Sequence, residues 1–455
     1  MNQPNIILIN CDDLGYGDIG CYDSTINQTP VLDRLAAEGV RFTDFYQASP
    51  VCSPSRGAML TGCYPPRIGF GMFEGKWVLF PGQGVGLNPS EITIAKVLQQ
   101  AGYATKLVGK WHCGDQPEFL PTRHGFDSYY GLPYSNDMGR QKGWNDKDVL
   151  FAPLPLMRDG NVIQEQPDQT SLTERYVEDS LRFIRDNAGR PFFLYLAHMY
   201  VHLPLYVPDR FLRESKNGSY GAAVAAIDWA TGVLLHELKA LGLENDTLVI
   251  FTSDNGSRCR DGGGSNGVLR GTKGTTWEGG LRVPCIMRWP GHISAGTTCC
   301  ELATALDFYP TLAALAGAKV PDDRKIDGID ISSLLLTGSG SPRDTFFYYH
   351  GNNLEAMRHG KWKLHVCKGK DELEELYDLE NDPGEIKNVY ETNPGIVREL
   401  MTKINNCRDD MGDDARGVAG QNVRSIGIVE QPDTLTHYNL NHPYIVALYD
   451  LKERG

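Results

Sequence analysis

The chain has 455 residues, a length that favours one large domain of about two to three hundred residues together with a smaller one. Hydrophobic residues make up 41% and aromatic residues 10%, enough for a sizeable core, which excludes a disordered, collagenous or coiled-coil protein. The 44 basic and 57 acidic residues give a net charge of −13, so we expect neither nucleic acid nor an anionic membrane as a partner.

The sequence offers no sign of a membrane anchor or of a disulfide framework. No apolar run approaches the roughly 20 residues that a membrane span needs, and a strand-like run begins by Asn5 without the features of a leader peptide. We therefore expect a cytoplasmic protein, or one whose leader has been removed, which leaves a secreted or periplasmic location open. The 11 cysteines are scattered without CxxC pairs, which does not suggest structural disulfides.

Short apolar strands alternate with helical patterns through roughly the first 340 residues. Residues 5–10 predict a strand that is covered on both faces. A helix over residues 29–39 follows, capped by Thr29 and closed by Gly39, and Ser90 begins another over residues 90–101. The later elements are a strand over 103–108, a helix over 172–186, a strand over 191–197, a helix over 221–241 and a strand over 247–253. This order predicts an α/β domain with a mostly parallel, mixed sheet between helices.

The composition changes near residues 337–342 (TGSGSP), which predicts a linker and divides the chain into domains over residues 1–340 and 341–455. Beyond the linker, the segments 346–350, 354–366 and 375–382 predict a short antiparallel sheet, followed by a helix near residues 394–406. The tail after Cys407 is irregular and rich in Asn, Asp and Gly. We hypothesise that this tail folds back to line the rim of a pocket.

Polar pairs follow two of the predicted strands. Asp12 and Asp13 come directly after the first strand, and Asp254 and Asn255 follow the strand over residues 247–253. Because ligands gather beyond the carboxyl ends of parallel strands, we expect these side chains to meet. Three carboxylates and an amide oxygen would form a hard, all-oxygen site for Ca²⁺ or Mg²⁺. Each pair alone favours an ordinary turn, and only the two together favour a metal site.

A second candidate site lies in residues 50–62 (PVCSPSRGAMLTG). Ser53-Pro54 predicts a helix start, which places Cys52 at the positive end of a helix dipole. This position favours an anionic nucleophile or an anionic substrate group, and Arg56, one turn onward, would point at the same anion. The residues alone leave a buried structural thiol as the alternative for Cys52.

These segments resemble the type I, formylglycine-dependent sulfatases. CSPSR, which begins at Cys52, matches the CxPxR motif of that family, and GYATKLVGKWH at residues 102–112 is similar to its second signature. Further similar segments are NIILINCDDLGYGDIG, LPYSNDMG, VIFTSDNG, RGTKGTTWEGGLRVP, WPGH and LYDLENDPGE. The resemblance extends from Asn5 to about Asn388. It implies an alkaline-phosphatase-like fold and hydrolysis of a sulfate ester.

In the resembled family, the motif cysteine is oxidised after translation to formylglycine, an aldehyde that hydrates to a geminal diol. The resemblance implies that a maturation enzyme converts Cys52 in this way. One hydroxyl would then attack sulfur, and the other would expel sulfate as the aldehyde re-forms. The resemblance also implies one Ca²⁺ ion that activates the diol and is held by Asp12, Asp13, Asp254 and Asn255.

The resemblance assigns roles to three cationic side chains. Arg56 would orient the formylglycine, while Lys110 and Lys273 would pair with sulfate oxygens and neutralise charge as it develops. Taken singly, Lys110 could instead be a solvated charge and Lys273 an ordinary loop lysine. Together, inside the matching signatures, they favour a sulfate-binding site.

The resemblance also assigns roles to neutral side chains. His112 would hydrogen-bond the diol, and His202, which precedes a proline in HLP, would protonate the leaving oxygen as a general acid. Ser135 would lie near the sulfate. His198 lacks the His-x-Pro context, so we leave it out of the predicted site, and a hydrogen-bonded core histidine is the alternative for His112 and His202.

One position departs from the family pattern. Cys63 stands where family members commonly carry arginine after Leu-Thr-Gly, although Arg67 is kept. This change would alter the support around the nucleophile or the substrate rim, but it removes no residue with a chemical role.

An acidic chain attracts an anionic substrate only through a local cluster of cations, so a long polyanion would be steered weakly. We therefore expect an exo-acting sulfatase on short saccharides. The members most resembled act on aryl sulfates and on sulfated N-acetylgalactosamine of glycosaminoglycans, which makes the latter the leading substrate. Two alternatives stay open: a phosphodiesterase or phosphonate monoester hydrolase of the same superfamily, and a non-catalytic anion- or sugar-binding protein whose Cys52 is unmodified. The oligomeric state is not predicted.

Overall fold

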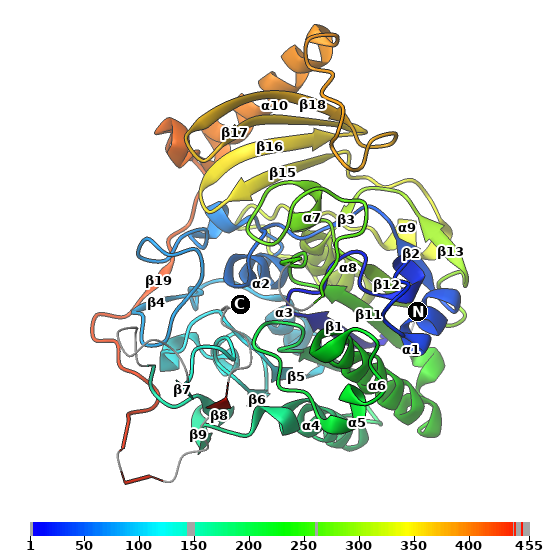
Figure 1. Ribbon diagram of the computed structural model, residues 1–455, viewed down its shortest axis with the longest axis vertical. Helices are drawn as coiled ribbons and strands as arrows, with labels where there is room; N and C mark the ends of the chain where they lie inside the picture. The colour runs from blue at the N-terminus through cyan, green and yellow to red at the C-terminus, as the bar shows by residue number, and fades with distance from the viewer. Residues whose placement is uncertain (1–2, 143–150, 260–262, 440, 443–446, 449–455) are drawn as a thin grey trace.

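The structure is a computed structural model (Figure 1), and it describes residues 3–142, 151–259, 263–439, 441–442 and 447–448. Its large body is built on a ten-stranded sheet with the order β13-β2-β12-β11-β1-β10-β5-β6-β8-β9. The five central strands, from β11 to β6, are parallel, whereas β12, β8 and β9 pair antiparallel with their neighbours. The predicted α/β fold with a mostly parallel mixed sheet is confirmed.

The strands of this sheet follow the apolar runs of the sequence. Their bounds are β1 (Asn5–Cys11), β2 (Val40–Phe42), β5 (Ala104–Gly109), β6 (Ser128–Gly131), β8 (Pro155–Arg158), β9 (Asn161–Glu165), β10 (Phe192–Ala197), β11 (Thr247–Ser253), β12 (Cys285–Arg288) and β13 (Thr297–Cys299). Every residue of β1 is buried, as expected for a strand with a helical layer on each face.

Helices cover both faces of the large sheet. The helices α1 (Pro30–Ala37), α4 (Leu172–Asp186) and α6 (Gly218–Ala240) share one apolar core with Ile7 and Ile9 of β1. The helices α2 (Cys52–Thr61), α3 (Ile94–Gln100) and α8 (Phe308–Leu315) share a second core with Ile6 and Leu8. The alternation of side chains along β1 therefore feeds two separate cores.

One predicted helix start and one predicted side-chain cap are wrong. The helix α3 begins at Ile94, where the Thr93 hydroxyl accepts a hydrogen bond from the Lys96 amide, and Ser90 lies outside it. The Thr29 side chain does not cap α1; the carboxylate of Asp228, on α6, accepts from the amides of Val31 and Leu32 instead. A cap from a distant helix satisfies the same amides but leaves no local trace in the sequence.

A smaller antiparallel sheet packs beside the large body, at the top of Figure 1, in the order β15-β16-β17-β18. Its strands are β15 (Thr345–His350), β16 (Asn353–His359), β17 (Trp362–Lys368) and β18 (Asp371–Asp378), and α10 (Pro394–Met411) lies against it. The predicted antiparallel strands and helix are confirmed. The division of the chain at residue 340 stays a prediction.

The chain after α10 runs back along the large body (Figure 1). The strand β19 (Gly427–Ile428) pairs with β4 (Val85–Gly86), and the Thr436 hydroxyl donates to the carbonyl of Pro153. The remaining short elements are β3 (Phe45–Tyr46), β7 (Gln141–Lys142), β14 (Ala303–Thr304), β20 (Ala447–Leu448), α5 (Asp209–Leu212), α7 (Glu278–Leu281) and α9 (Ser332–Thr337). Among the described residues, no helix has the length and apolar character needed to cross a membrane.

Candidate active site

The two acidic pairs meet because β1 and β11 are parallel neighbours in register. Cys11 lies opposite Ser253, so Asp12 and Asp254 leave the sheet at the same edge. The Asp13 amide donates to Asp254 Oδ1 at 3.3 Å, and ligand atoms of Asp12, Asp13, Asp254 and Cys52 lie within 4.8 Å of one another. Asp13 has a φ of 61°, a left-handed conformation that costs a non-glycine residue roughly 1–2 kcal/mol and is typical of functional sites.

The donor set fits a hard divalent cation such as Ca²⁺. The Asn255 amide nitrogen donates to Asp13 Oδ1 at 2.8 Å, and Asn255 Oδ1 is buried without a hydrogen-bond partner among the described residues. A buried acceptor without a donor is costly, and a cation beside three carboxylates would satisfy it. Burial and the neighbouring Asp12 carboxylate raise the pKa of Asp254 to about 7, although Arg56 acts in the opposite direction.

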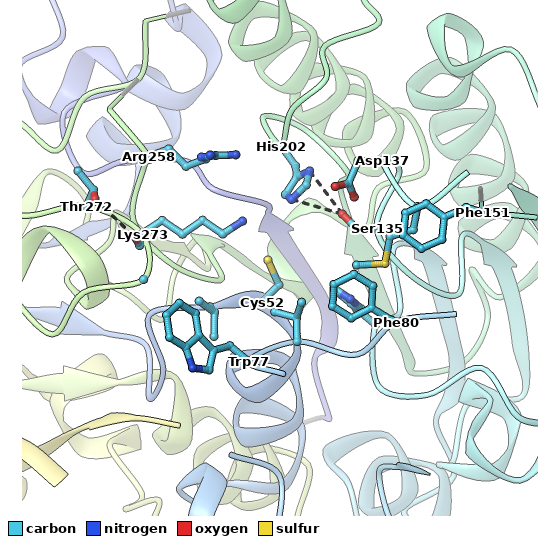
Figure 2. A pocket seen from close by; sticks show the side chains of 15 residues that line it. Cys52, Trp77, Phe80, Ser135, Asp137, Phe151, His202, Arg258, Thr272 and Lys273 are labelled. Atoms are coloured by element: carbon cyan, nitrogen blue, oxygen red, sulfur yellow. Dashed lines mark hydrogen bonds between the residues drawn. The ribbon is translucent and has the colours of Figure 1, made fainter. Parts of the chain in front are cut away.

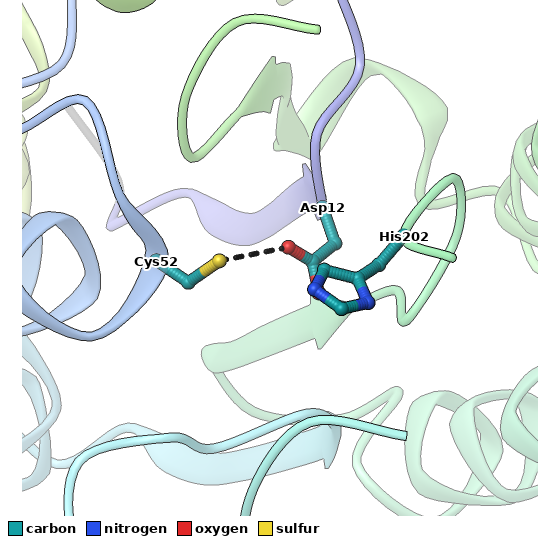
Figure 3. A group of neighbouring side chains, drawn as sticks. All are labelled: Asp12, Cys52 and His202. Carbon is teal, nitrogen blue, oxygen red and sulfur yellow. Dashed lines mark hydrogen bonds between the residues drawn. The ribbon is translucent and has the colours of Figure 1, made fainter. Parts of the chain in front are cut away.

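Cys52 is the first residue of α2, as the sequence predicted. Its thiol donates to Asp12 Oδ1 at 3.3 Å, and Figure 3 shows Asp12 between Cys52 and His202. Burial and then the Asp12 carboxylate raise the pKa of the thiol well above its usual value, despite the helix N-terminus. The unmodified Cys52 is therefore a neutral thiol in this arrangement, and the expectation that the helix start favours an anionic nucleophile or an anionic substrate group stays a prediction.

Three cations surround Cys52 and the carboxylates. Arg56 Nε and Nη2 lie 2.8 Å from Asp254 Oδ2, and Nη1 donates to the carbonyl of Lys110. The Lys110 ammonium lies 2.5 Å from Asp12 Oδ2, and the Lys273 ammonium lies 2.8 Å from Asp13. Burial alone would raise the pKa of Asp12, but Lys110 and the other nearby cations hold it well below its usual range.

The backbone around Lys273 ties its loop to the nucleophile segment. The Lys273 amide donates to the carbonyl of Ser257, and the next amide, of Gly274, donates to the carbonyl of Pro50. Pro50 is two residues before Cys52, so the lysine and the cysteine are held by the same loop contacts. All three predicted cations therefore converge on the predicted acids and on Cys52.

His202 is neutral in this arrangement. Its Nδ1 lies 2.6 Å from the carbonyl of Leu203 and 3.1 Å from Asn136 Oδ1; because both are acceptors, we assign the ring proton to Nδ1. The other nitrogen, Nε2, lies 3.3 Å from the hydroxyl of Ser135, which is also 3.3 Å from the Lys110 ammonium. Burial, and next the charge of Lys273, lower the pKa of His202 to about 3.

His112 presents an unprotonated nitrogen to the same region. Its Nε2 lies 2.9 Å from the carbonyl of Leu79, which requires the proton on Nε2, and its Nδ1 is buried without a hydrogen-bond partner. Burial and the neighbouring Lys110 lower its pKa well below the usual value. His112 is therefore a hydrogen-bond acceptor beside Cys52. His198, excluded from the predicted site, is buried at the end of β10 and does not line the cavity.

A cavity of about 270 Å³ opens over Cys52 (Figure 2). Of the predicted residues, it is lined by Cys52, His112, Ser135, His202 and Lys273. The sequence analysis missed several other lining residues, namely Val51, Trp77, Val78, Phe80, Asp137, Met138, Phe151, Arg258, Thr272 and Gly274. Asp137 lies in the matching segment LPYSNDMG, which signalled it, whereas Trp77 and Phe80 belong to no motif. None of the tail residues that the structure describes lines the cavity, so the hypothesis that the tail lines the pocket rim is wrong for these residues.

The tail instead reaches the position that departs from the family pattern. Arg424 donates from Nη2 to Cys63 Sγ at 3.3 Å and pairs with Glu91 at 2.7 Å. Arg67, which keeps the family pattern, pairs with Asp327 at 2.7 Å. A guanidinium from the tail therefore lies beside the cysteine that replaces the usual arginine.

Comparisons with known proteins agree with this geometry. The profile of the sulfatase family matches residues 4–318, and that of the C-terminal part of N-sulphoglucosamine sulphohydrolase matches residues 272–410. Arylsulfatase A of Homo sapiens is 41% identical over 442 residues, which cover 88% of this chain and 86% of the relative. N-acetylgalactosamine-6-sulfatase of Rattus norvegicus is 41% identical over 391 residues, which cover 82% and 73%.

The fold has close counterparts among solved structures. Ps i-CgsB in complex with k-i-k-neocarrahexaose superposes with a TM-score of 0.80 at 32% identity, covering 89% of this chain and 93% of that one. The fold and the family that the sequence resembles are thereby confirmed. The chain belongs to the sulfatase family, whose members are sulfuric ester hydrolases.

Proposed function

We propose that this sulfatase removes a terminal sulfate from a short sulfated saccharide at the cavity over Cys52. The observation that carries the proposal is that Cys52, three buried carboxylates and the ammonium groups of Lys110 and Lys273 lie together beside a cavity that Cys52 and Lys273 line. In a chain of net charge −13, this cluster is a local site for a small anion rather than a groove for a long polyanion.

The nucleophile proposed here is formylglycine formed from Cys52 by a maturation enzyme. The raised pKa of the Cys52 thiol argues against attack by a thiolate, because almost none would be present near pH 7. A hydrated formylglycine would supply a hydroxyl nucleophile and a second hydroxyl that releases sulfate. Around it, Asp12 Oδ1 and the unprotonated Nδ1 of His112 are acceptors that would hold and remove hydroxyl protons.

We assign Asp12, Asp13, Asp254 and Asn255 as the ligands of one Ca²⁺ ion. When bound, the ion would act as a Lewis acid that lowers the pKa of the nucleophilic hydroxyl. Asn255 Oδ1 has the role of an acceptor reserved for the ion, since nothing else satisfies it. Arg56 would fix Asp254 through its two contacts at 2.8 Å and so orient the ligand set.

The cations and His202 act on the sulfate and on the leaving group. Lys110, Lys273 and the Ser135 hydroxyl would bind sulfate oxygens and stabilise the charge that develops on them. The positive charge of Lys273 contributes to the low pKa of His202. A bound sulfate would offset this charge and raise the pKa, so substrate binding favours protonation of Nε2. The protonated ring would then donate Nε2–H to the leaving oxygen as a general acid.

The leading substrate is sulfated N-acetylgalactosamine from a glycosaminoglycan fragment. The support is the 41% identity to N-acetylgalactosamine-6-sulfatase together with the small volume of the cavity. The test is a panel of sulfated monosaccharides and disaccharides, assayed after expression with a maturation enzyme and with the mass of the Cys52 peptide measured in parallel. We expect turnover to follow the oxidised fraction and to be highest on sulfated galactosamine units. Turnover by protein with unmodified Cys52 would reject formylglycine as the nucleophile. Turnover on other sugars alone would reject sulfated galactosamine as the substrate.

A comparison of initial rates on an aryl sulfate and an aryl phosphate diester tests the alternative reaction. Both esters present a tetrahedral anionic centre to the same cations, so the geometry alone permits either reaction. We expect the sulfate ester to react faster. A faster reaction of the diester would favour the phosphodiesterase alternative.

A further inference from the structure

An aromatic side chain with no role in the reaction stands at the cavity. Trp77 lines it, yet 53% of the residue is exposed, which makes it one of the few large apolar residues left open to solvent. It follows a turn in which Glu74 and Gly75 both have a positive φ and Phe73 and Lys76 form a β-bridge. A single exposed tryptophan needs no explanation by itself, so its position and its support carry the argument.

The ring of Trp77 is supported from the small sheet. The centroid of the His350 ring, at the end of β15, lies 4.5 Å from that of Trp77 with an angle of 57° between the planes. His350 Nδ1 in turn lies 3.7 Å from the buried carboxylate of Glu355. This support gives the exposed ring a defined place, because a contact on one face restricts its rotamers while the cavity remains open to it.

A second aromatic wall lies across the cavity. Figure 2 shows Trp77 on one side of Cys52 and Phe80 on the other. Phe80 stacks on Phe151 with a centroid distance of 6.3 Å and an interplanar angle of 18°. A group attached to a sulfate bound by Lys273 would therefore lie between apolar ring surfaces.

The polar groups of the cavity indicate what kind of ring fits there. Figure 2 shows the side chain of Asp137 beside that of Ser135, and Asp137 is only 5% exposed. A carboxylate accepts hydrogen bonds from hydroxyl groups, and it repels a further anionic group on the part of the substrate that faces Asp137. Pyranoses combine the two properties required: their hydroxyl groups lie at the edge of the ring, and their C–H groups form a face that packs on aromatic rings.

We propose that Trp77 and Asp137 form a subsite for the pyranose ring that carries the sulfate. The face of the ring stacks on Trp77, and one of its free hydroxyl groups donates to Asp137. The subsite rests on the proposed function, since it presumes a saccharide ester. It selects a sugar whose hydroxyl group near Asp137 is unsubstituted.

The experiment measures kcat and KM of the matured enzyme for a sulfated galactosamine and for methyl sulfate, which has no ring. Because stacking holds the sugar equally in the ground and transition states, Trp77→Ala should raise KM for the sugar about ten-fold and leave kcat within about two-fold. Trp77→Phe should keep most of the affinity, and Asp137→Asn should raise KM for the sugar by a smaller factor. With methyl sulfate the two Trp77 variants should match the wild type.

Trp229→Ala is the matched control, because Trp229 lies on α6 against Arg210 and Phe211 and does not line the cavity. Its kinetic constants should equal those of the wild type. A KM for the sugar that changes less than two-fold in Trp77→Ala would overturn the subsite, as would an equal rise for methyl sulfate. Thermal unfolding of each variant excludes loss of folding as the cause.

Calorimetric binding of the same sugar sulfate to Cys52→Ala, with and without Trp77→Ala, separates the two proposals. One outcome is that the sugar sulfate binds to Cys52→Ala in a way that depends on Trp77, but the matured wild type does not hydrolyse it. This outcome would reject the proposed function and keep the subsite. Turnover of the sugar without dependence on Trp77 would keep the proposed function and reject the subsite. No binding to Cys52→Ala would reject the subsite as well.

Discussion

Two of the buried charge clusters that the structure describes differ in their relation to the cavity over Cys52: one lies beside this cavity, and the other contributes no residue to its lining. The active-site cluster consists of Asp12, Asp13, Asp254, Arg56, Lys110 and Lys273. The second, which we name the anchoring cluster, lies where the small sheet meets α7 and consists of Glu278, Arg282, Lys363, His365 and Glu385. Both are almost fully buried, so burial of charge does not distinguish an active site from a structural contact.

The pairing of the charges does distinguish them. In the anchoring cluster, Lys363 lies 2.9 Å from both Glu278 and Glu385, and His365 Nε2 lies 2.6 Å from Glu385. Around the active-site cluster, by contrast, Asn255 Oδ1 and His112 Nδ1 are buried without hydrogen-bond partners. Unsatisfied polar atoms beside an open cavity mark groups reserved for a ligand, whereas satisfied ones mark a structural network.

The pKa shifts of the acids, unlike their pairing, do not separate the two clusters. Burial and a neighbouring acid raise the pKa of Asp254 to about 7. Burial alone would also raise the pKa of Glu278, but Lys363 and then Arg282 lower it to about 2. Each cluster also holds an acid shifted the other way: against the effect of burial, Lys110 and the other cations lower the pKa of Asp12, whereas burial, with Glu278 nearby, raises the pKa of Glu385.

The largest expected effect is that of Cys52→Ala. Removal of the nucleophile should lower turnover at least about 10⁴-fold, while the free energy of unfolding changes little because a small side chain fits the helix start. Cys285→Ala is the control, since Cys285 is also a buried thiol but does not line the cavity. Near-normal sulfatase turnover by Cys52→Ala would reduce Cys52 to a structural thiol and end the proposed mechanism.

The next largest effect is expected for Lys273→Met, which removes a lysine of the active-site cluster. Loss of a cation that acts on transition-state charge should lower kcat about 10²–10³-fold. Lys239→Met, at the exposed end of α6, provides the control and should leave kcat unchanged. Steady-state kinetics decide the matter, and a kcat within three-fold of the wild type would remove Lys273 from the sulfate-binding site.

Lys363→Met should produce the opposite pattern. Two buried carboxylates lose their shared partner, so unfolding in urea should show a loss of about 3–5 kcal/mol, whereas kcat per folded molecule falls less than in Lys273→Met. Lys361→Met is matched to it, because Lys361 pairs with Asp378 at 2.7 Å but is 40% exposed and should contribute less than about 1 kcal/mol. If Lys363→Met lowered kcat as much as Lys273→Met, the anchoring cluster would belong to the catalytic machinery.

The elements that position the active-site cluster could be predicted from the sequence because their signals are local. The apolar runs of β1 and β11 end directly before Asp12 and Asp254, and the motif around Cys52 fixes the start of α2. The two acidic pairs then converge through the parallel pairing of neighbouring strands, which follows from the order of strands and helices.

The anchoring cluster, the cap of α1 and the aromatic walls of the cavity could not be predicted in this way. Asp228 caps a helix almost two hundred positions earlier in the chain, and Lys363 of β17 meets Glu278 of α7, 85 positions earlier. Trp77 owes its place to His350 of the small sheet. Each depends on a contact between distant segments whose residue types are common elsewhere, so neither periodicity nor spacing marks it.

The smallest expected effect is the response of the anchoring cluster to acid. Because the pKa of Glu278 is about 2 in the folded chain and about 4.5 when unfolded, its contribution to stability is present above pH 4.5 and lost as the pH falls toward 2. Between pH 6 and pH 3.5, the wild type should lose about 1.4 kcal/mol more unfolding free energy than Glu278→Gln, which cannot titrate at this position. Urea unfolding of both proteins at the two pH values measures this quantity. Any destabilisation that Glu278→Gln causes equally at both pH values cancels in the comparison. Equal losses in the two proteins would mean that the Glu278 pKa is the same folded and unfolded, and that Lys363 and Arg282 do not offset its burial.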